Sequence, residues 1–268
     1  MIANVTMLIM SCDKFSDLWT GHARLLERNW GDRNMKTYIV SDRQSEIKLP
    51  GVEVICAGED VEWSERLRYA LQYVNTEYVF VTLDDYYLIK AVNNQQMENL
   101  VSLMYQEKVD YIRLFPRPKR ATKETFKGLK NIKRIDTSCD YSVNLYAGIW
   151  KKEFLSSCIR NPMNAWKFEV SLHRRAVEYG AMCLVSNRGE FEILDVVRKG
   201  KLLRRASRYF KKHPGIYTGN RGTNSLRYET KLSIQQFFSR HLPRKMYRWM
   251  KALLTKSGMK FYSDQVDE

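Results

Sequence analysis

The sequence has few of the features that mark disulfide-rich, zinc-binding or membrane-spanning proteins. Its 268 residues contain only five cysteines, odd in number and scattered, at Cys12, Cys56, Cys139, Cys158 and Cys183. This spacing argues against a disulfide scaffold and a zinc ribbon and favours a reducing compartment. No apolar run approaches the roughly 18 residues of a transmembrane helix, and residues 1–10 lack the basic start and cleavage site of a signal peptide. We therefore expect a cytoplasmic protein without a transmembrane helix.

Two glycine-rich nucleotide motifs are also missing. No G-x-G-x-x-G follows the first apolar segment, and the sequence contains no G-x-x-x-x-G-K-[ST] loop. Such glycines let the backbone approach phosphate groups closely, so their absence argues against the common NAD and ATP binders. A nucleotide would have to be held by carboxylates and a metal ion instead.

Acidic residues are scarce near the C-terminus. Between Val196 and Lys260 there are 18 Lys and Arg residues against one acid, Glu229, whereas the rest of the chain is nearly neutral. A basic segment of this kind can contact nucleic acid, an anionic membrane surface or phosphate-bearing ligands, or it can simply face solvent. Apolar residues recur among the bases from 202 to 254 at helical intervals, which is typical of an interfacial helix and also of a terminal helix packed on its domain. We favour an anionic membrane surface over nucleic acid, and the apolar residues would also suit a homodimer.

The remaining sequence alternates between strand-like and helix-like segments. Strands are expected at 3–10, 36–40, 51–56, 77–83, 109–115, 140–148, 181–186 and 191–197, and helices at 17–30, 63–74, 93–107 and 164–180. The polar stretch 116–130 is expected to be a loop. This alternation predicts an α/β fold, a mostly parallel mixed sheet with helices on both faces. We place the sheet domain in residues 1–197 and a basic, partly helical segment in 198–268.

Polar residues follow several of the predicted strands, where ligands bind in open α/β sheets. Ser11 and Asp13 follow the first strand, Asp42 follows the second, and Asp84 and Asp85 follow the apolar segment EYVFVTL. Adjacent carboxylates repel each other, and a divalent cation relieves the repulsion. Mn(II) or Mg(II) shared with a diphosphate fits this pattern. The alternative is a turn in which both acids face water.

Four segments occur in an order shared with one enzyme family: SCDKFSDLW at 11–19, WSERL at 63–67, EYVFVTLDDYYL at 77–88 and WKFE at 166–169. They resemble bacterial glycosyltransferases with the GT-A fold that build capsule and O-antigen. The resemblance covers roughly residues 1–200. It implies transfer of a sugar from a nucleotide-diphosphate donor, such as a UDP-sugar, to a polyprenyl-diphosphate-linked glycan.

The resemblance also implies roles for individual residues. Asp85 would bind the metal ion, Asp84 would contact the ribose or the donor sugar, and Asp13 would meet the nucleobase. Trp63, Arg66 and Trp166 match other segments of the family and are expected to contact substrate.

Glu169 is the expected general base. It shares one helix face with Trp166 and His173 and lies near the helix start, where the macrodipole favours an ionised carboxylate. Such a carboxylate can deprotonate an acceptor hydroxyl, and the sugar would then be transferred with inversion. His173 would hold it in place. The alternative is a surface glutamate paired with His173 or Lys167.

Arg198 and Lys201 are expected to neutralise the leaving diphosphate. Two other functions stay open. A nucleic-acid-binding protein would use the basic segment, but the sequence lacks a helix-turn-helix, zinc spacing and stacking aromatics. A sugar nucleotidyltransferase would share the sheet and the carboxylates, but it usually has a glycine-rich basic loop that is missing here. We expect a glycosyltransferase associated peripherally with the inner face of the membrane.

Overall fold

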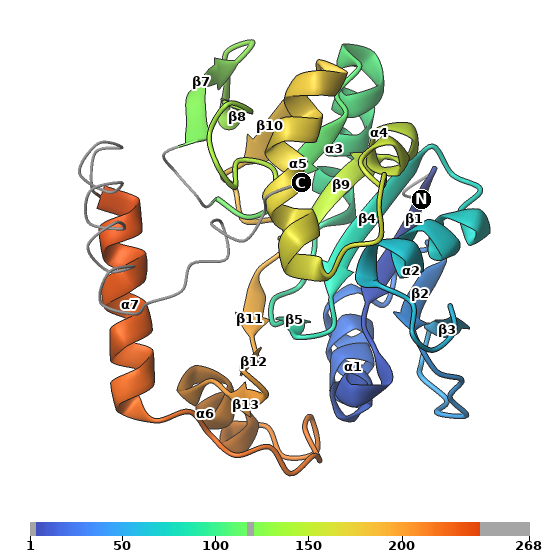
Figure 1. The fold of residues 1–268 in the computed structure, drawn as a ribbon, viewed down its shortest axis with the longest axis vertical. Helices are drawn as coiled ribbons and strands as arrows, with labels where there is room; N and C mark the ends of the chain where they lie inside the picture. Colours follow the sequence, from blue (N-terminus) through green and yellow to red (C-terminus); the bar gives the residue numbers. More distant parts are fainter. Residues whose placement is uncertain (1–3, 117–120, 242–268) are drawn as a thin grey trace.

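The computed structural model of the chain describes residues 4–116 and 121–241, with side chains up to residue 234. Its main feature is a nine-stranded mixed sheet in the order β3-β2-β1-β4-β9-β6-β10-β8-β7 (Figure 1). Besides β7 and β8, its strands are β1 (Val5–Met10), β2 (Thr37–Ser41), β3 (Glu53–Cys56), β4 (Tyr78–Leu83), β6 (Tyr111–Arg113), β9 (Gly148–Lys151) and β10 (Cys183–Ser186). The predicted mostly parallel α/β architecture is confirmed.

Strand direction brings several segments to one edge of this sheet. β1, β2, β3 and β4 are parallel to one another, and β10 is parallel to β6. β9 is antiparallel to both of its neighbours, β4 and β6. The carboxyl ends of β1, β2, β4 and β6 therefore lie at the same edge as the start of β9. Polar residues that follow or precede these strands can meet there.

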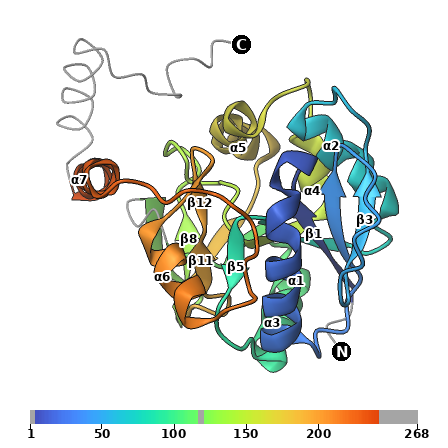
Figure 2. The same cartoon turned by 90° about the horizontal axis from the view of Figure 1, so that it is seen from below.

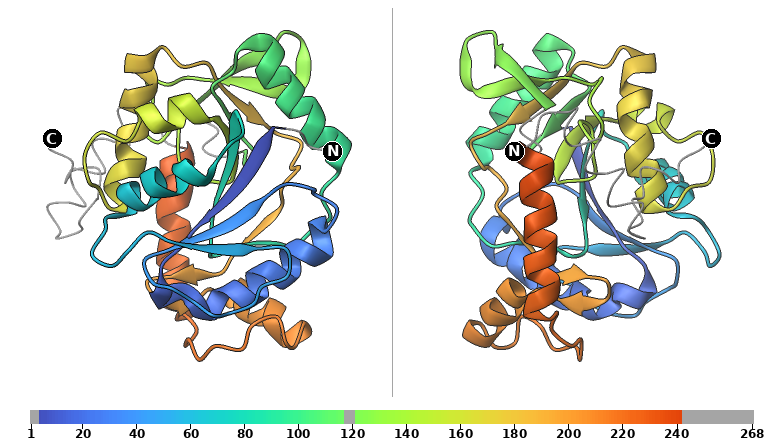
Figure 3. Two further views of the ribbon diagram at one scale, coloured as in Figure 1. Left: turned by 90° about the vertical axis from the view of Figure 1, so that its right-hand side faces the viewer. Right: turned by 60° about the vertical axis from the view of Figure 1, so that its left-hand side comes forward.

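Helices cover both faces of the sheet (Figure 3). α1 (Trp19–Trp30) and α3 (Asn94–Glu107) pack on one face, and α2 (Trp63–Ala70), α4 (Lys152–Ser157) and α5 (Ala165–Tyr179) pack on the other. Residues of β1 alternate between the two cores, with Met7 and Ile9 in the first and Leu8 and Met10 in the second. Short 3-10 helices, η1 (Asp13–Leu18) and η2 (Leu71–Tyr73), precede α1 and follow α2.

Two predicted segments differ from the structure. The expected loop 116–130 contains most of a hairpin, β7 (Thr122–Phe126) and β8 (Leu129–Ile135), whose turn residues Lys127 and Gly128 have positive φ. β7 is the edge strand and β8 is next to it, and most of their residues are exposed, so both lack the apolar pattern of a buried strand. The expected strand 140–148 is instead a loop up to residue 147, because side chains of β6 take up its backbone carbonyls.

The segment after the sheet packs on the domain. β5 (Tyr86–Leu88) pairs with β11 (Ile193–Asp195), and a hairpin of β12 (Val197–Arg198) and β13 (Lys201–Leu202) leads into α6 (Arg204–Lys212). Ala206 and Phe210 of α6 join a small apolar cluster with Leu18 and Tyr87. For α6, the packed alternative is therefore the correct one. The division at residue 198 stays a prediction, although α6 is continuous with the domain core.

α7 (Leu226–His241) stands apart from the sheet in two views (Figures 1 and 2). The predicted amphipathic pattern from 234 to 254 falls largely on residues or side chains outside the described part. Within the described part, none of the helices has both the length and the apolar character needed to cross a bilayer. The five cysteines are free thiols.

Candidate active site

The acidic pair lies at the carboxyl end of β4, and its first member is oriented from β1. Asp84 is buried, and the Ser11 hydroxyl donates a hydrogen bond to its Oδ2 atom. Trp19 Nε1 donates to Ser11 Oγ at 2.7 Å, which fixes the direction of that hydroxyl. Burial raises the pKa of Asp84 to about 7, and the Ser11 bond opposes this rise. Ser11, predicted to bind substrate, is thus placed to orient Asp84.

Asp85 lies next to a second carboxylate, Asp195, which the sequence analysis missed. Asp195 ends β11 opposite Tyr86 of β5, and the backbone N–H of Val196 donates to Asp85 O at 2.9 Å. Each carboxylate has one buried oxygen, Oδ1, without a hydrogen-bond partner. Burial raises the pKa of both groups, and the charge of Asp195 raises that of Asp85 further. Asp195 falls inside the predicted strand 191–197 and close to the acids Glu190 and Glu192, so no local pattern singles it out.

Arg198 forms an ion pair with one acid of the site and influences two others through its charge. Its Nη2 and Nε atoms donate to Asp195 Oδ2 at 2.7 and 3.1 Å. Its charge also lowers the pKa values of Asp85 and Glu169, against the larger effect of burial. Arg198 therefore lies within electrostatic range of all three carboxylates, as expected for a residue that neutralises charge at this centre.

The orphaned oxygens of Asp85 and Asp195 suit a hard divalent cation. Mg(II) and Mn(II) bind through one or two carboxylates and complete their coordination with water and phosphate oxygens. Among residues 4–116 and 121–241, no group of three or more His, Cys, Asp or Glu side chains is placed to hold a metal ion. Two carboxylates would leave coordination positions for water or for the phosphate oxygens of a ligand.

Three predicted substrate-binding residues meet beside Ser11. The backbone N–H of Asp13 donates to Asp42 Oδ1 at 2.6 Å, and Arg66 Nη1 lies 3.5 Å from Asp42 Oδ2. Burial raises the pKa of Asp42, but these interactions lower it below its ordinary value. Arg66 Nε is buried without a hydrogen-bond partner. This group places charged and polar atoms at the ends of β1 and β2.

Trp63 is not part of that group. Its side chain is only 7% exposed and packs on Phe168, with ring centroids 5.3 Å apart. The structure thus places the predicted substrate contact in the core between α2 and α5. Its physical role is packing, because a buried indole in this position has no face left for a ligand.

Glu169 is held by the loop that precedes β9. α5 starts after Asn164, whose side chain accepts a hydrogen bond from Lys167 N at 3.0 Å. Glu169 Oε1 accepts one from the backbone N–H of Leu145 at 3.1 Å. Burial raises the pKa of Glu169, and the Leu145 bond opposes it. A carboxylate with a raised pKa suits the work of a general base.

His173 does not hold Glu169 as expected. Its Nε2 atom lies 3.7 Å from Asp140 Oδ1, and burial lowers its pKa. Leu145 N takes the role that the sequence assigned to His173. Trp166, one turn before Glu169, is 50% exposed, and Lys201 lies opposite Arg198 in the hairpin with an exposed side chain.

The C-terminal segment also contacts the loop after β1. Arg221 forms a two-pronged pair with Asp17, with Nε and Nη2 at 2.8 and 2.7 Å from the two carboxylate oxygens. Tyr217 OH donates to the same carboxylate at 2.9 Å, and Arg221 Nη2 donates to Lys14 O at 2.7 Å. About 200 residues separate these partners, so no local pattern could have revealed the pair.

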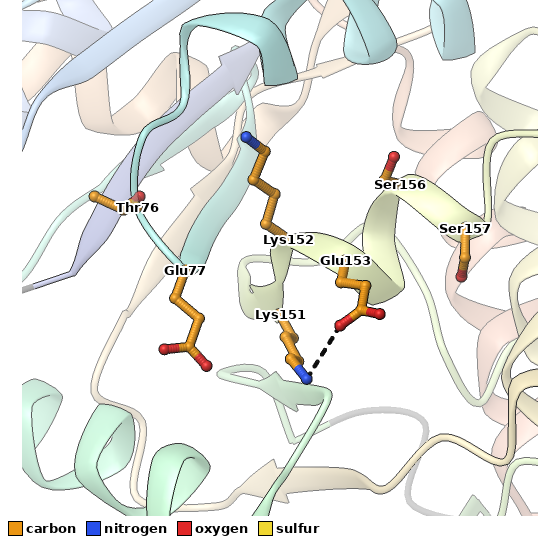
Figure 4. A pocket seen from close by; sticks show the side chains of 7 residues that line it. All are labelled: Thr76, Glu77, Lys151, Lys152, Glu153, Ser156 and Ser157. Carbon is orange, nitrogen blue, oxygen red and sulfur yellow. Dashed lines mark ion pairs between the residues drawn. The ribbon is translucent and has the colours of Figure 1, made fainter.

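A separate pocket of about 750 Å³ lies at the opposite edge of the sheet (Figure 4). It is lined by Thr76 and Glu77, which precede β4, and by residues around the start of α4. The Lys151–Glu153 ion pair, 3.3 Å long, crosses its wall. Because Asp84 and Asp85 follow β4, this pocket does not belong to the acidic centre.

Comparisons with known proteins support the fold. No family model matches the sequence, and no curated protein does. Among solved structures, the chain is similar to the mannosyltransferase PcManGT from Pyrobaculum calidifontis, in complex with GDP-Man and Mn²⁺, with 13% identity and a TM-score of 0.50. The fold is GT-A-like. The match covers 74% of this chain and 58% of the mannosyltransferase, so the chain spans little more than half of that protein.

Two further structures are more distant from this GT-A-like chain. S. aureus TarS 1–349 in complex with UDP-GlcNAc has 11% identity and a TM-score of 0.46, covering 74% of this chain and 60% of that one. A cytidylyltransferase from Leptospira borgpetersenii serovar Hardjo-bovis has 13% identity and a TM-score of 0.41, covering 81% and 98%. At 13% identity, the likeness to the mannosyltransferase shows the fold alone.

Proposed function

We propose that this protein is a glycosyltransferase that transfers a sugar from a nucleotide-diphosphate donor, a UDP-sugar, to an acceptor hydroxyl. The observation that carries the proposal is the pair Asp85 and Asp195. Each has a buried carboxylate oxygen without a partner, at the edge of a GT-A-like sheet where ligands bind. Glu169 lies within the electrostatic range of Arg198, which pairs with Asp195.

The donor would bind across two groups of residues. Asp13, Asp42 and Arg66 face the nucleobase end, and Asp84 contacts the ribose or the donor sugar. Asp85 and Asp195 hold Mn(II) or Mg(II). When bound, the cation neutralises charge on the diphosphate and so makes it a better leaving group.

The transfer step uses Glu169 and the basic hairpin. Glu169 accepts the proton of the acceptor hydroxyl while that oxygen forms a bond to the anomeric carbon of the donor sugar. The bond from this carbon to the diphosphate oxygen breaks, and the nucleoside diphosphate leaves with both bonding electrons. Arg198 and Lys201 offset its negative charge. Attack from the side opposite the leaving group inverts the anomeric configuration.

The proposal extends to the acceptor and the location. The acceptor is a polyprenyl-diphosphate-linked glycan of surface polysaccharide synthesis, of the capsule or O-antigen type. Exposed bases of α6 support contact with an anionic membrane surface: Arg204, Arg205, Arg208, Lys211 and Lys212. Because the apolar face of α6 packs on the domain, this contact is electrostatic. A homodimer through the C-terminal segment is part of the same proposal and is tested by solution mass measurement.

The donor assignment is tested by thermal unfolding with UDP, GDP, CDP and ADP, each with and without Mn²⁺. We expect UDP to stabilise the protein, and only when metal is present; stabilisation by another diphosphate instead would contradict the UDP-sugar assignment. Equal stabilisation by all four diphosphates without metal, or by none, contradicts the proposal. A nucleotidyltransferase would instead release pyrophosphate from a nucleoside triphosphate and a sugar phosphate, and a nucleic-acid-binding protein would shift random DNA or RNA in a gel.

A further inference from the structure

Two side chains of β6 hold the loop that precedes β9. Tyr111 OH donates a hydrogen bond to Asn144 O at 3.0 Å, and Arg113 Nη1 donates to Ser142 O at 2.6 Å. Tyr111 and Arg113 are two residues apart on one strand, so their side chains point to the same face. The two carbonyls that they bind are also two residues apart. The spacing of the donors thus matches the spacing of the acceptors.

Arg113 is a buried cation that binds backbone carbonyls rather than a carboxylate. Its side chain is fully buried, and burial lowers its pKa; the groups that oppose this effect are two tyrosines and a cysteine rather than a carboxylate. Nε donates to Phe115 O at 2.8 Å, while Nη2 has no partner. A buried cation without a counter-ion is costly. Here its donors are used to fix backbone carbonyls around the loop.

Gly148 provides the room that Tyr111 needs. A Cβ atom at Gly148 would lie 2.8 Å from Cε2 of the Tyr111 ring and 3.0 Å from Ile112 O. Across the strands, Gly148 pairs with Arg113, and the Tyr111 ring packs on Trp150 with centroids 4.1 Å apart. The ring is therefore held between β9 and the loop, with its hydroxyl directed at Asn144 O.

Tyr111 and Glu169 bind the two ends of the same peptide group. The carbonyl of Asn144 and the N–H of Leu145 belong to one planar peptide group and point in opposite directions. Tyr111 binds the carbonyl end of this group, and Glu169 Oε1 accepts the hydrogen bond from its N–H end at 3.1 Å. Rotation of the peptide group would break both bonds. The Asn144 side chain braces the same turn, because it donates to Tyr141 O and accepts from Tyr146 N.

We propose that Tyr111, supported by Arg113, is a positioning residue for Glu169: it fixes one peptide group and so aims the Leu145 N–H at the carboxylate. The inference deepens the proposed function, because it rests on Glu169 as the group that accepts the acceptor proton. Two groups face that carboxylate, the Leu145 N–H from the loop and Arg198 from β12. Tyr111 from β6 lies behind the peptide group; burial raises its pKa, and the charge of Glu169 raises it further. His173, one turn along α5, is paired with Asp140.

The test is Tyr111→Phe, which keeps the ring and removes the hydroxyl. Glu169 is titrated by ¹³C-carboxyl NMR, with its resonance identified by its loss in Glu169→Gln. We expect the midpoint to move upward by about one pH unit, because the Leu145 bond stabilises the ionised form. The Leu145 amide should exchange with solvent about tenfold faster. Gly148→Ala, which displaces the same ring, should move both readouts in the same direction.

Tyr87→Phe is the matched control. Tyr87 is also buried, and its hydroxyl donates to a backbone carbonyl, Leu18 O, at 2.7 Å, away from the loop. This variant should lose comparable stability and leave the Glu169 midpoint in place. An unchanged midpoint in Tyr111→Phe, or the same shift in Tyr87→Phe, overturns the inference. If the midpoint moves but Glu169→Gln still hydrolyses nucleotide sugars at the normal rate, the positioning role stands and the proposed base does not.

Discussion

At the scale of single residues, the two adjacent acids after β4 lie in different surroundings. Asp84 is oriented by Ser11 and is part of a hydrogen-bond chain that ends at Trp19. Asp85 has a buried oxygen without a hydrogen-bond partner, and so does the neighbouring acid, Asp195, whose charge raises the pKa of Asp85 beyond the effect of burial. Buried polar atoms without partners destabilise a protein, and they occur mainly where a bound ligand supplies the missing interaction. Asp85 therefore points to a ligand site more directly than Asp84 does.

The first prediction concerns Asp85→Asn. Because burial raises the pKa of Asp85 and its Oδ1 atom has no hydrogen-bond partner, this change should leave the ligand-free protein as stable as before or raise its Tm. At this size, 1 kcal/mol corresponds to about 2–4 °C. The stabilisation by Mn²⁺ with a nucleoside diphosphate, about 2.7 kcal/mol at 100-fold excess over Kd, should vanish. Thermal unfolding with and without ligand measures both.

Asp110→Asn provides the control for that experiment. Asp110 is also buried, with a pKa raised by burial, but it precedes β6 and so lies at the other edge of the sheet. Its replacement should leave the response to metal intact. A large loss of ligand-free stability in Asp85→Asn, with the metal response preserved, would contradict the account of Asp85.

The second prediction concerns His22, which is fully buried and lies 3.1 Å from Asp84 O through Nδ1. Burial lowers its pKa from 6.5 to about 4. Protonation therefore favours the unfolded chain, and the stability that neutral His22 contributes is lost as pH falls from 6.5 through 4. Relative to His22→Gln, which does not titrate, the wild type should lose about 3 kcal/mol over this range. Urea unfolding at several pH values measures the difference, and parallel pH curves for the two proteins would refute it.

At the scale of elements, the segment after α6 is pressed against α1. Arg24 of α1 donates to Gly215 O at 2.6 Å, and Ile216 O lies so close to Gly21 that a Cβ atom there would collide with it. Because the obstacle is backbone, the segment would have to move as a whole. Together with the Asp17–Arg221 pair, this contact joins the C-terminal segment to the start of the candidate site.

The third prediction follows from this close approach. Gly21→Ala should destabilise the protein by about 1–3 kcal/mol, as overpacking does in cores. Gly222→Ala is the control, since a Cβ atom there meets nothing within 4 Å. Chemical denaturation should give a lower free energy of unfolding for Gly21→Ala than for Gly222→Ala. Equal stability of both would mean that the segment does not pack on α1 in solution.

The elements that could be predicted from sequence are those whose pattern is local. The buried strand before Asp84 and the helix between Asn164 and Gly180 follow from an apolar run and from caps, and the structure contains both. The β7–β8 hairpin was missed because its strands are polar. The loop before β9 reads as a strand because Val143 and Leu145 are apolar and buried in the core, but side chains of β6, not a neighbouring strand, bind the carbonyls of Ser142 and Asn144.

At the scale of the whole molecule, the candidate site depends on contacts between distant segments. Sequence reasoning found Asp13, Asp42 and Arg66, which strand ends and one motif supply, and the structure brings them together. It could not find Asp195 beside Asp85, because their proximity comes from the pairing of β5 with β11. It also could not show that Ala206 and Phe210 of α6 pack with Leu18 and Tyr87; the division at residue 198 stays a prediction.

The fourth prediction concerns the contacts that hold the segment after residue 201 to the rest of the chain. Asn224 is buried and donates to backbone carbonyls of the hairpin, including Arg198 O at 3.1 Å. A chain that ends at Ser225 should therefore keep the fold and the donor site, whereas one that ends at Lys201 should be strongly destabilised. Circular dichroism and nucleotide binding compare the two. Retention of both properties in the shorter chain would show that the α6 cluster is dispensable.

The central claim is that Asp85 and Asp195 share a divalent cation with the donor diphosphate. The most direct measurement is a titration of Mn²⁺ followed by electron paramagnetic resonance, in which the spectrum of free Mn²⁺ disappears on binding. With the nucleoside diphosphate that stabilises the protein, we expect tight binding in the wild type and weak binding in both Asp85→Asn and Asp195→Asn. Free Mn²⁺ throughout the titration, or equal binding in the wild type and both variants, would contradict the claim.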